Sequence, residues 1–243
     1  MKEGVRMILF RKAVLIIHGF TGNLYDNEYL MNYLELDPRL DVYARTLPGH
    51  RADRFSSAKV EDWLNFVDNQ IKELINNGYK TIYVIGHSMG GILTTYVAGK
   101  YKQIKKIVLI NAAFDYINLK QNKQDLKERD LEKYSHLWEK ALRTSPLMFY
   151  EFTKLVKKGQ GYLKKVTCPV LILRSTRDEI IPYEVGDKIY QNIGTVEGKK
   201  WITDVKGAWH TIISSDRKEV TSGYIRDFLK GGYRWKRNIK KEI

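Results

Sequence analysis

The sequence predicts an α/β fold in which a mainly parallel sheet is flanked by helices. Short apolar runs, many of them β-branched, alternate along the chain with longer segments of helical period. Most of these runs are apolar almost throughout, which is typical of strands covered on both faces, as in a parallel sheet. The chain has 243 residues, of which 43% are hydrophobic, so it is long enough to bury one large core.

Six apolar runs are expected to form strands, and a seventh to add an edge strand. The six are residues 13–17, 41–46, 81–85, 106–110, 169–173 and 200–205, and the edge strand is residues 7–10. The clearest helix is expected over residues 60–78, with Gly78 as a natural stop. Its apolar stripe consists of Val60, Trp63, Leu64, Val67, Ile71, Leu74 and Ile75. Further helices are expected after Ser88, after Pro182 and over residues 217–229.

One long segment interrupts this alternation. Residues 115–166 contain no convincing strand, and their charged helical sequence carries an apolar stripe. Open α/β sheets bind ligands at the carboxyl ends of their strands. We therefore expect residues 115–166 to form a helical cap over that edge. The core then comprises residues 1–114 and 167–243, and the whole chain is a single domain.

Charge and composition limit the classes of partner and compartment. The net charge is +14, but the basic residues are spread along the chain, with denser runs over 154–165 and 234–243. Both runs are expected to be solvated surface, and no nucleic acid partner is expected. The single cysteine, Cys168, excludes an intramolecular disulfide and is expected to be a buried thiol.

No membrane segment or export signal is expected. No apolar stretch approaches the roughly 20 residues that span a bilayer. The apolar start of the chain is split by Arg11 and Lys12, and no small-residue cleavage site follows it. The sequence therefore favours a cytoplasmic protein without a transmembrane segment.

A glycine-rich turn follows the run over residues 81–85. Residues 86–90 read GHSMG, which matches the pattern G-x-S-x-G between a predicted strand and a predicted helix. This context is the one a nucleophile elbow requires, because the sharp turn holds its serine in a strained backbone conformation. Gly86 and Gly90 permit the close strand–helix approach that a side chain would block. Ser88 is therefore the candidate nucleophile, and an ordinary turn is the alternative.

Two further polar residues at strand ends could activate Ser88. A serine hydroxyl is a poor nucleophile at neutral pH and needs a general base held by an orienting acid. Asp178 follows the run over residues 169–173, and His210 follows the run over residues 200–205. The carboxyl ends of parallel strands lie at one edge of the sheet. We therefore expect Ser88, Asp178 and His210 to meet there as nucleophile, acid and base.

Other residues compete for the roles of base and acid. His87 adjoins Ser88, and its side chain is expected to point away from the partner of the serine hydroxyl. The remaining histidines are expected to have structural or surface roles, and they are His18, His50 and His136. For the acid, Asp115 is the alternative to Asp178, because it also closely follows a predicted strand.

The loop after the first strand can stabilise negative charge. Residues 18–22, HGFTG, follow the run over residues 13–17. A glycine-rich loop at this edge can direct a backbone N–H toward the oxyanion that develops during acyl transfer. We assign the N–H of Phe20 as one donor and the N–H of Met89, immediately after Ser88, as the other. The alternative is a plain loop.

These motifs together resemble the α/β-hydrolase family, and most closely its small bacterial carboxylesterases and monoacylglycerol lipases. The resemblance rests on HGFTG, LPGH, GHSMGG, the D-x-x-I-P that begins at Asp178, and the late GAWH. It covers nearly the whole chain and is most specific over residues 13–115 and 166–229. It implies the triad Ser88, Asp178 and His210, the same oxyanion hole, and a small helical cap over an acyl pocket. The sequence departs from the family in RSTRD, which lacks the glycine often found upstream of the acid.

The expected reaction is hydrolysis of a short- to medium-chain acyl ester, a small-molecule substrate, through an acyl-enzyme on Ser88. No metal or organic cofactor is expected, because the sequence has no histidine–carboxylate pair at ligand spacing and no phosphate-binding glycine loop. The residues expected to line the acyl pocket are Phe20, Leu147, Met148, Phe149, Ile180 and Ile181, with ordinary core or cap packing as the alternative for each.

Three other functions are compatible with parts of the sequence. The same residues could transfer the acyl group to an alcohol, thiol or peroxide, as an acyltransferase or perhydrolase does. A non-catalytic binding protein on this fold would be expected to lack a member of the triad, and none is missing. A polyanion-binding protein would show strongly salt-dependent binding, but this function gives no reason for three polar residues at strand ends.

Overall fold

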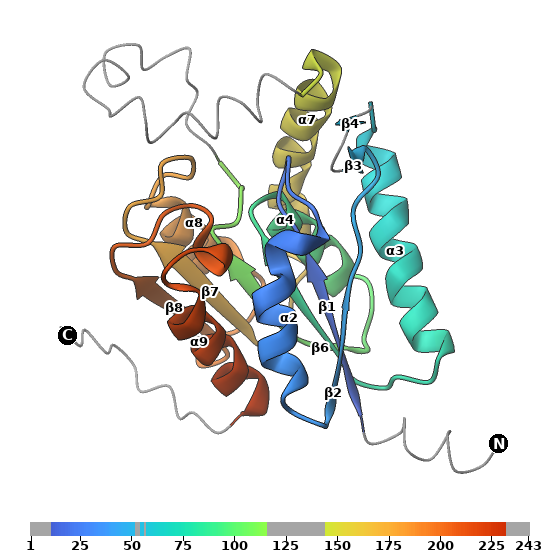
Figure 1. Ribbon diagram of the computed structural model, residues 1–243, viewed down its shortest axis with the longest axis vertical. Coiled ribbons are helices and arrows are strands. Elements are labelled where there is room, and N and C mark those ends of the chain that lie inside the picture. The colour runs from blue at the N-terminus through green and yellow to red at the C-terminus, as the bar shows by residue number, and fades with distance from the viewer. Residues whose placement is uncertain (1–10, 52–53, 56, 116–143, 232–243) are drawn as a thin grey trace.

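A six-stranded sheet forms the centre of the molecule, and its strands all run parallel (Figure 1). The computed structural model describes residues 11–51, 54–55, 57–115 and 144–231. The strands are β1 (Lys12–Ile17), β2 (Leu40–Ala44), β5 (Ile82–His87), β6 (Ile104–Ile110), β7 (Val170–Ser175) and β8 (Lys200–Val205). All six predicted strands are confirmed, with ends shifted by about two residues at most. The predicted edge strand over residues 7–10 lies outside the described residues.

The strand order creates a place for a ligand. The order across the sheet is β2-β1-β5-β6-β7-β8. The chain therefore adds β2 on one side of β1, and then continues outward from the other side, beginning with β5. Where the direction of winding reverses in this way, the loops after the two neighbouring strands diverge and open a crevice at their carboxyl ends. The crevice is thus expected between the loops that follow β1 and β5.

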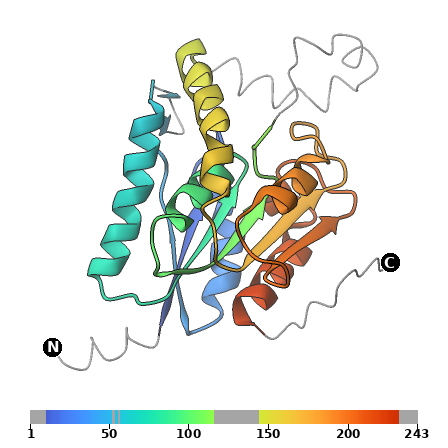
Figure 2. The same ribbon diagram turned by 180° about the vertical axis from the view of Figure 1, so that it is seen from behind.

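Helices cover both faces of the sheet, which explains why most of its strands are apolar almost throughout. One face is packed against α3 (Val60–Asn76), α4 (Met89–Ala98), α7 (Pro146–Leu163) and α8 (Val185–Asn192). The other face is packed against α2 (Glu28–Glu35) and α9 (Lys218–Lys230). Figures 1 and 2 show these two layers from opposite sides. Strand β1 serves both cores, because Ala13, Leu15 and Ile17 face the first layer while Val14 and Ile16 face the second.

The predicted helices are confirmed in the described parts of the chain. Helix α3 buries Trp63, Val67 and Ile71 from its apolar stripe, and Gly78 follows it with a φ of 94°. A positive φ of this kind ends a helix readily at glycine, which has no side chain to clash. The helices expected after Ser88, after Pro182 and near the end of the chain correspond to α4, α8 and α9.

Several short elements were not predicted. They are α2, the two 3-10 turns η1 (Leu24–Asn27) and η2 (Ile212–Ser214), and the antiparallel pair β3 (His50–Arg51) and β4 (Arg54–Phe55). None of the described helices is long and apolar enough to cross a membrane.

Helix α7 makes up most of the described part of the segment predicted to be a cap, since residues 116–143 lie outside the described residues. Met148, Phe152 and Leu155 of α7 are buried in the same core cluster as the apolar face of α4. The two helices approach closely at Gly159, where an added Cβ would lie 3.2 Å from Ile92 Cγ2. The division into a core and a cap over residues 115–166 stays a prediction.

Candidate active site

Ser88 lies on a sharp turn between β5 and α4. Its φ of 53° and ψ of −119° place a non-glycine residue in a sparsely populated backbone region, which costs about 1–3 kcal/mol. A Cβ added at Gly86 would lie 2.2 Å from Gly90 O, and one added at Gly90 would lie 2.2 Å from Ile17 O. The prediction that both glycines are needed for close packing is therefore confirmed.

The surrounding backbone holds this turn in place. The N–H of Ser88 donates to Ile110 O at 2.9 Å, and Ser88 O accepts from the N–H groups of Gly91 and Ala113 at 2.9 and 3.1 Å. The bonds with Ile110 and Ala113 tie the turn to the end of β6, and Ser88 is 6% exposed. A strained residue persists only when its surroundings fix it in this way.

The HGFTG loop after β1 packs directly against Ser88. A Cβ added at Gly19 would lie 3.0 Å from Ser88 Cβ, so a larger residue would displace the loop from the serine. His18 links this loop to Leu47, because its Nδ1 donates to Gly19 O at 2.8 Å and its Nε2 accepts from the N–H of Leu47 at 2.9 Å. Burial lowers the pKa of His18 to about 4, so its ring is neutral. The expected structural role of His18 is confirmed.

The two amides predicted to form the oxyanion hole lie in these two adjacent segments. Met89 is the first residue of α4, so its N–H is one of the four that have no partner within the helix. The helix dipole also favours negative charge at this end. Phe20 follows Gly19 in the loop that packs against Ser88.

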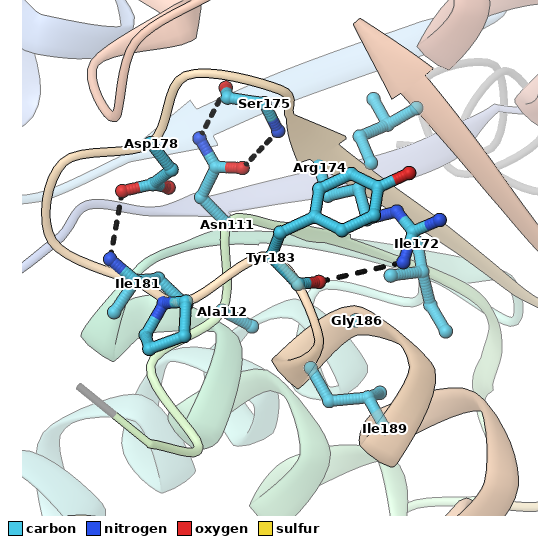
Figure 3. Close-up of a pocket in the computed structure, with 12 residues that line it drawn as sticks. Asn111, Ala112, Ile172, Arg174, Ser175, Asp178, Ile181, Tyr183, Gly186 and Ile189 are labelled. Carbon is cyan, nitrogen blue, oxygen red and sulfur yellow. Dashed lines mark hydrogen bonds between the residues drawn. The ribbon is translucent and has the colours of Figure 1, made fainter. Parts of the chain in front are cut away.

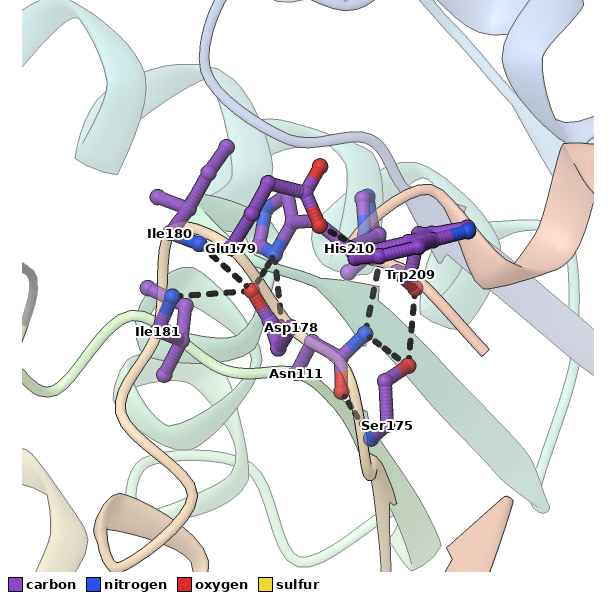
Figure 4. A network of polar contacts seen from close by, with 9 residues as sticks. Asn111, Ser175, Asp178, Glu179, Ile180, Ile181, Trp209 and His210 are labelled. Carbon is purple, nitrogen blue, oxygen red and sulfur yellow. Dashed lines mark hydrogen bonds and ion pairs between the residues drawn. The ribbon is translucent and has the colours of Figure 1, made fainter. Parts of the chain in front are cut away.

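Asp178 and His210 meet at the carboxyl end of the sheet (Figure 4). His210 Nδ1 lies 3.0 Å from Asp178 Oδ1 and 2.9 Å from Asp178 Oδ2. Asp178 Oδ1 also accepts the backbone N–H groups of Ile180 and Ile181 at 2.9 and 2.8 Å. Because a carboxylate only accepts hydrogen bonds, Nδ1 carries the ring hydrogen and Nε2 of the neutral ring is an acceptor.

Asp178 and His210 each stabilise the charged form of the other. Burial disfavours the charged form of Asp178, but His210 and the two backbone N–H groups outweigh it and lower the pKa of the carboxyl below its usual value. Burial likewise opposes protonation of His210, but Asp178 outweighs it and raises the pKa of the imidazole. The site therefore holds a carboxylate that favours a proton on the ring beside it.

The rival acid Asp115 lies at the surface instead. Its side chain is 54% exposed and forms an ion pair with Lys188 at 3.3 Å. Of the two carboxylates considered, Asp178 is the one that the structure brings to His210.

The prediction for His87 was wrong. Its side chain points toward His210, with 4.9 Å between the two ring centroids, and its Nε2 lies 2.8 Å from His210 O. Side chains alternate between the two faces of a strand, so His87 lies on the same face of β5 as Ile85. The turn η2 packs on that face.

His50 braces its own turn, through Nδ1 and Pro48 O at 3.0 Å. His136 lies outside the described residues.

Three polar residues beside His210 were missed. Asn111 directly follows β6, Ser175 ends β7, and Glu179 follows Asp178; all three contact the His210 segment or one another (Figure 4). Asn111 and Ser175 meet the criterion that identified Asp178, a polar residue at the end of a parallel strand.

Among the described residues no hydrogen bond joins the Ser88 hydroxyl to His210. In enzymes of this kind, the hydrogen bond between nucleophile and base is often long before substrate binds.

The residues predicted to line an acyl pocket fall into two groups. Phe20 stacks on Phe152 of α7 at 4.7 Å between ring centroids and meets the edge of Phe149 at 6.4 Å. Leu147 and Phe149 are about half exposed, whereas Met148 is buried in the core. Next to Asp178, Ile181 is buried and Ile180 is partly buried.

A small hollow lies between β7, α8 and the loop that carries Asp178 (Figure 3). Its lining is mostly apolar and includes Ala112, Ile172, Ile181 and Ile189. The residues that line it include Asp178 but neither Ser88 nor His210. This hollow is therefore not the crevice expected between the loops that follow β1 and β5.

Known proteins resemble this chain in sequence and structure. The model of the alpha/beta hydrolase fold family matches residues 12–158. A thermostable monoacylglycerol lipase of Bacillus sp. (strain H-257) is 28% identical over 222 residues, which are 82% of each chain. A carboxylesterase of Bacillus subtilis (strain 168) is 24% identical over 237 residues, which are 90% of this chain and 92% of the relative. The crystal structure of Paleococcus ferrophilus monoacylglycerol lipase superposes with a TM-score of 0.70 at 21% identity, covering 93% of this chain and 96% of the other.

The family match covers more than half of the chain and spans β1, the HGFTG loop and the turn at Ser88. The parallel sheet with helices on both faces agrees with it. The protein therefore belongs to the α/β-hydrolase family.

Proposed function

We propose that the protein is a serine esterase that hydrolyses carboxylic esters, with Ser88 as nucleophile, His210 as general base and Asp178 as orienting acid. The observation that carries this proposal is the Asp178–His210 pair of buried side chains, joined at 2.9 and 3.0 Å, at the same sheet edge as Ser88. The turn conformation of Ser88 supports the role of nucleophile, because a strained serine between a parallel strand and a helix is what a nucleophile elbow requires.

The proposed reaction has two stages. His210 Nε2 takes the hydroxyl proton as Ser88 Oγ attacks the ester carbonyl, and the N–H groups of Phe20 and Met89 hold the oxyanion. His210 then gives that proton to the departing alcohol, which leaves an acyl group on Ser88. Water attacks the acyl-enzyme as His210 takes one of its protons, and His210 returns that proton to Ser88 Oγ as the carboxylic acid is released.

Asp178 contributes orientation and charge. Its carboxylate accepts the Nδ1–H of His210, so the ring presents Nε2 as a base. As the ring becomes positive in each stage, the adjacent carboxylate stabilises it. The raised pKa of the imidazole supports this role, since Asp178 is the main cause of the rise and Glu179 adds to it.

The proposed substrates are short- to medium-chain acyl esters. The relatives described above include a monoacylglycerol lipase and a carboxylesterase, which supports an ester with an aliphatic acyl chain. Phe20, Phe149 and Phe152 form an aromatic cluster that extends from the HGFTG loop to α7. We propose that this cluster forms one wall of the acyl pocket, beneath a cap that includes α7.

A series of p-nitrophenyl esters tests this function. We expect hydrolysis of the acetate, butyrate and octanoate esters, and kcat/KM for the palmitate ester about tenfold or more below the best of them, because a pocket discriminates chain length by a modest factor per methylene. The release of nitrophenolate measures each rate. Failure to hydrolyse any ester would contradict the proposed activity, whereas a preference for palmitate would contradict only the chain length.

A further inference from the structure

The backbone of His210 is held from both sides by side chains of three other segments. Its carbonyl oxygen accepts from His87 Nε2 at 2.8 Å and from Asn111 Nδ2 at 2.9 Å. Its N–H donates to Glu179 Oε2 at 2.9 Å. One residue earlier, Trp209 O accepts from Ser175 Oγ at 2.8 Å. The loop after β8 is therefore fixed by polar groups from β5, β6 and β7 at the residue whose ring must be placed most accurately.

His87 can only donate in this contact. A carbonyl oxygen accepts, so the hydrogen must be on Nε2 of His87. Burial, together with the neighbouring His210, lowers the pKa of His87 to about 3, so the ring stays neutral in the range where His210 titrates. His87 is thus suited to hold the His210 segment but not to exchange protons with it.

Asn111 is held in an unfavourable backbone conformation beside the same carbonyl. Its φ of 43° is in the left-handed region, which asparagine tolerates better than most residues. The side chain is buried and fully engaged: Nδ2 donates to His210 O and Ser175 Oγ, and Oδ1 accepts the N–H of Ser175. A buried amide with every bond directed at the His210 and Ser175 segments rigidifies both.

We propose that His87 and Asn111 are positioning residues, which hold the His210 carbonyl so that the imidazole stays aligned between Asp178 and Ser88. This inference rests on the proposed function. An error of about 1 Å in the position of a catalytic group costs about a hundredfold in rate, and the ring of His210 moves with its backbone. Two donors from adjacent strand ends on one carbonyl oxygen restrict that movement without touching the ring's proton-transfer nitrogen.

Paired substitutions at His87 isolate the donated hydrogen bond. In His87→Phe the ring shape is kept and the donor is lost, so we expect kcat to fall about 10- to 100-fold with little change in KM. In His87→Gln an amide N–H can occupy the place of Nε2, and we expect it to restore most of the lost kcat. Thr195→Val is the matched control: the buried Thr195 hydroxyl donates to Cys168 O at 2.8 Å near the opposite end of the sheet, and its loss should leave kcat unchanged.

A second variant and a readout independent of turnover complete the test. Asn111→Gly keeps the left-handed conformation and removes the amide, and we expect the same loss of kcat. The imidazole pKa of His210 can be measured by NMR, because only five histidines contribute ring signals that must be assigned. In Ser88→Ala protein, adding His87→Phe or Asn111→Gly should lower that pKa toward its ordinary value, because the contact with Asp178 loosens. The Thr195→Val change should not lower it.

The outcomes separate this inference from the proposed function. If folded His87→Phe and Asn111→Gly proteins keep the wild-type kcat and the wild-type His210 pKa, the positioning role is wrong and the esterase proposal stands. A Thr195→Val protein that loses as much kcat as His87→Phe would also overturn it, since the effect would then be general. If Ser88→Ala keeps full esterase activity, the proposed function is what fails.

Discussion

Replacing Ser88 with alanine should lower kcat for ester hydrolysis by about 10⁵-fold or more, down to the background of the remaining site. The loss is expected because no acyl-enzyme can form, while the oxyanion donors and substrate contacts are unchanged. The assay is nitrophenolate release from the best p-nitrophenyl ester, with circular dichroism to confirm that the variant is folded. Alanine also has a Cβ, so the strained turn at Ser88 is no more costly than in the wild type.

Ser222→Ala is the matched control for this substitution. Ser222 is also buried, but its hydroxyl donates to Lys218 O at 2.7 Å within α9. Its removal deletes a buried serine hydroxyl without touching the loops at the end of the sheet, and activity should stay within about twofold of the wild type. Undiminished hydrolysis by Ser88→Ala, or an equal loss in Ser222→Ala, would contradict the assignment of Ser88.

Replacing Asp178 with asparagine should lower kcat by about 10⁴-fold. The asparagine amide can donate to His210 Nδ1, which would leave the ring hydrogen on Nε2, so the nitrogen assigned to the serine could no longer accept its proton. The variant also removes the negative charge that raises the pKa of His210. Initial rates with the same ester, measured across the pH range in which the imidazole titrates, report both effects.

Asp115→Asn distinguishes the two candidate acids. Asp115 is paired with Lys188 at the surface, and exposed pairs of this kind contribute only about 0–1 kcal/mol. We therefore expect its kcat to match the wild type. If Asp115→Asn loses activity and Asp178→Asn retains it, the acid has been assigned to the wrong residue.

Much of the fold could be predicted because strands buried on both faces leave a simple pattern. The runs predicted for β1, β5, β6 and β7 are apolar almost throughout, and helix α3 combines a regular stripe with a glycine stop. Helix α2 has only eight residues, and its N-cap makes no side-chain hydrogen bond. Local sequence does not specify such a helix, which is stabilised by packing of Leu30 and Leu34 on the sheet.

The candidate site could likewise be predicted only in part. Ser88, Asp178 and His210 could be proposed together because the topology of a parallel sheet brings strand ends to one edge. The contacts of His87 could not be predicted, because its partner His210 lies 123 residues away in sequence. Adjacency to Ser88 suggested a side chain directed elsewhere, whereas the alternation of β5 turns it toward the loop after β8. Contacts between loops depend on the arrangement of the whole sheet edge, which local patterns do not encode.

A covalent adduct on Ser88 tests the central claim most directly. The protein would be treated with a fluorophosphonate, which phosphonylates an activated serine, then digested and analysed by mass spectrometry. We predict one adduct per chain, located on Ser88, and none in Ser88→Ala. We also predict that labelling slows strongly in Asp178→Asn, because His210 must take the serine proton. An adduct on another residue, or labelling of Ser88→Ala at the wild-type rate, would contradict the proposal that this chain acts through an activated Ser88.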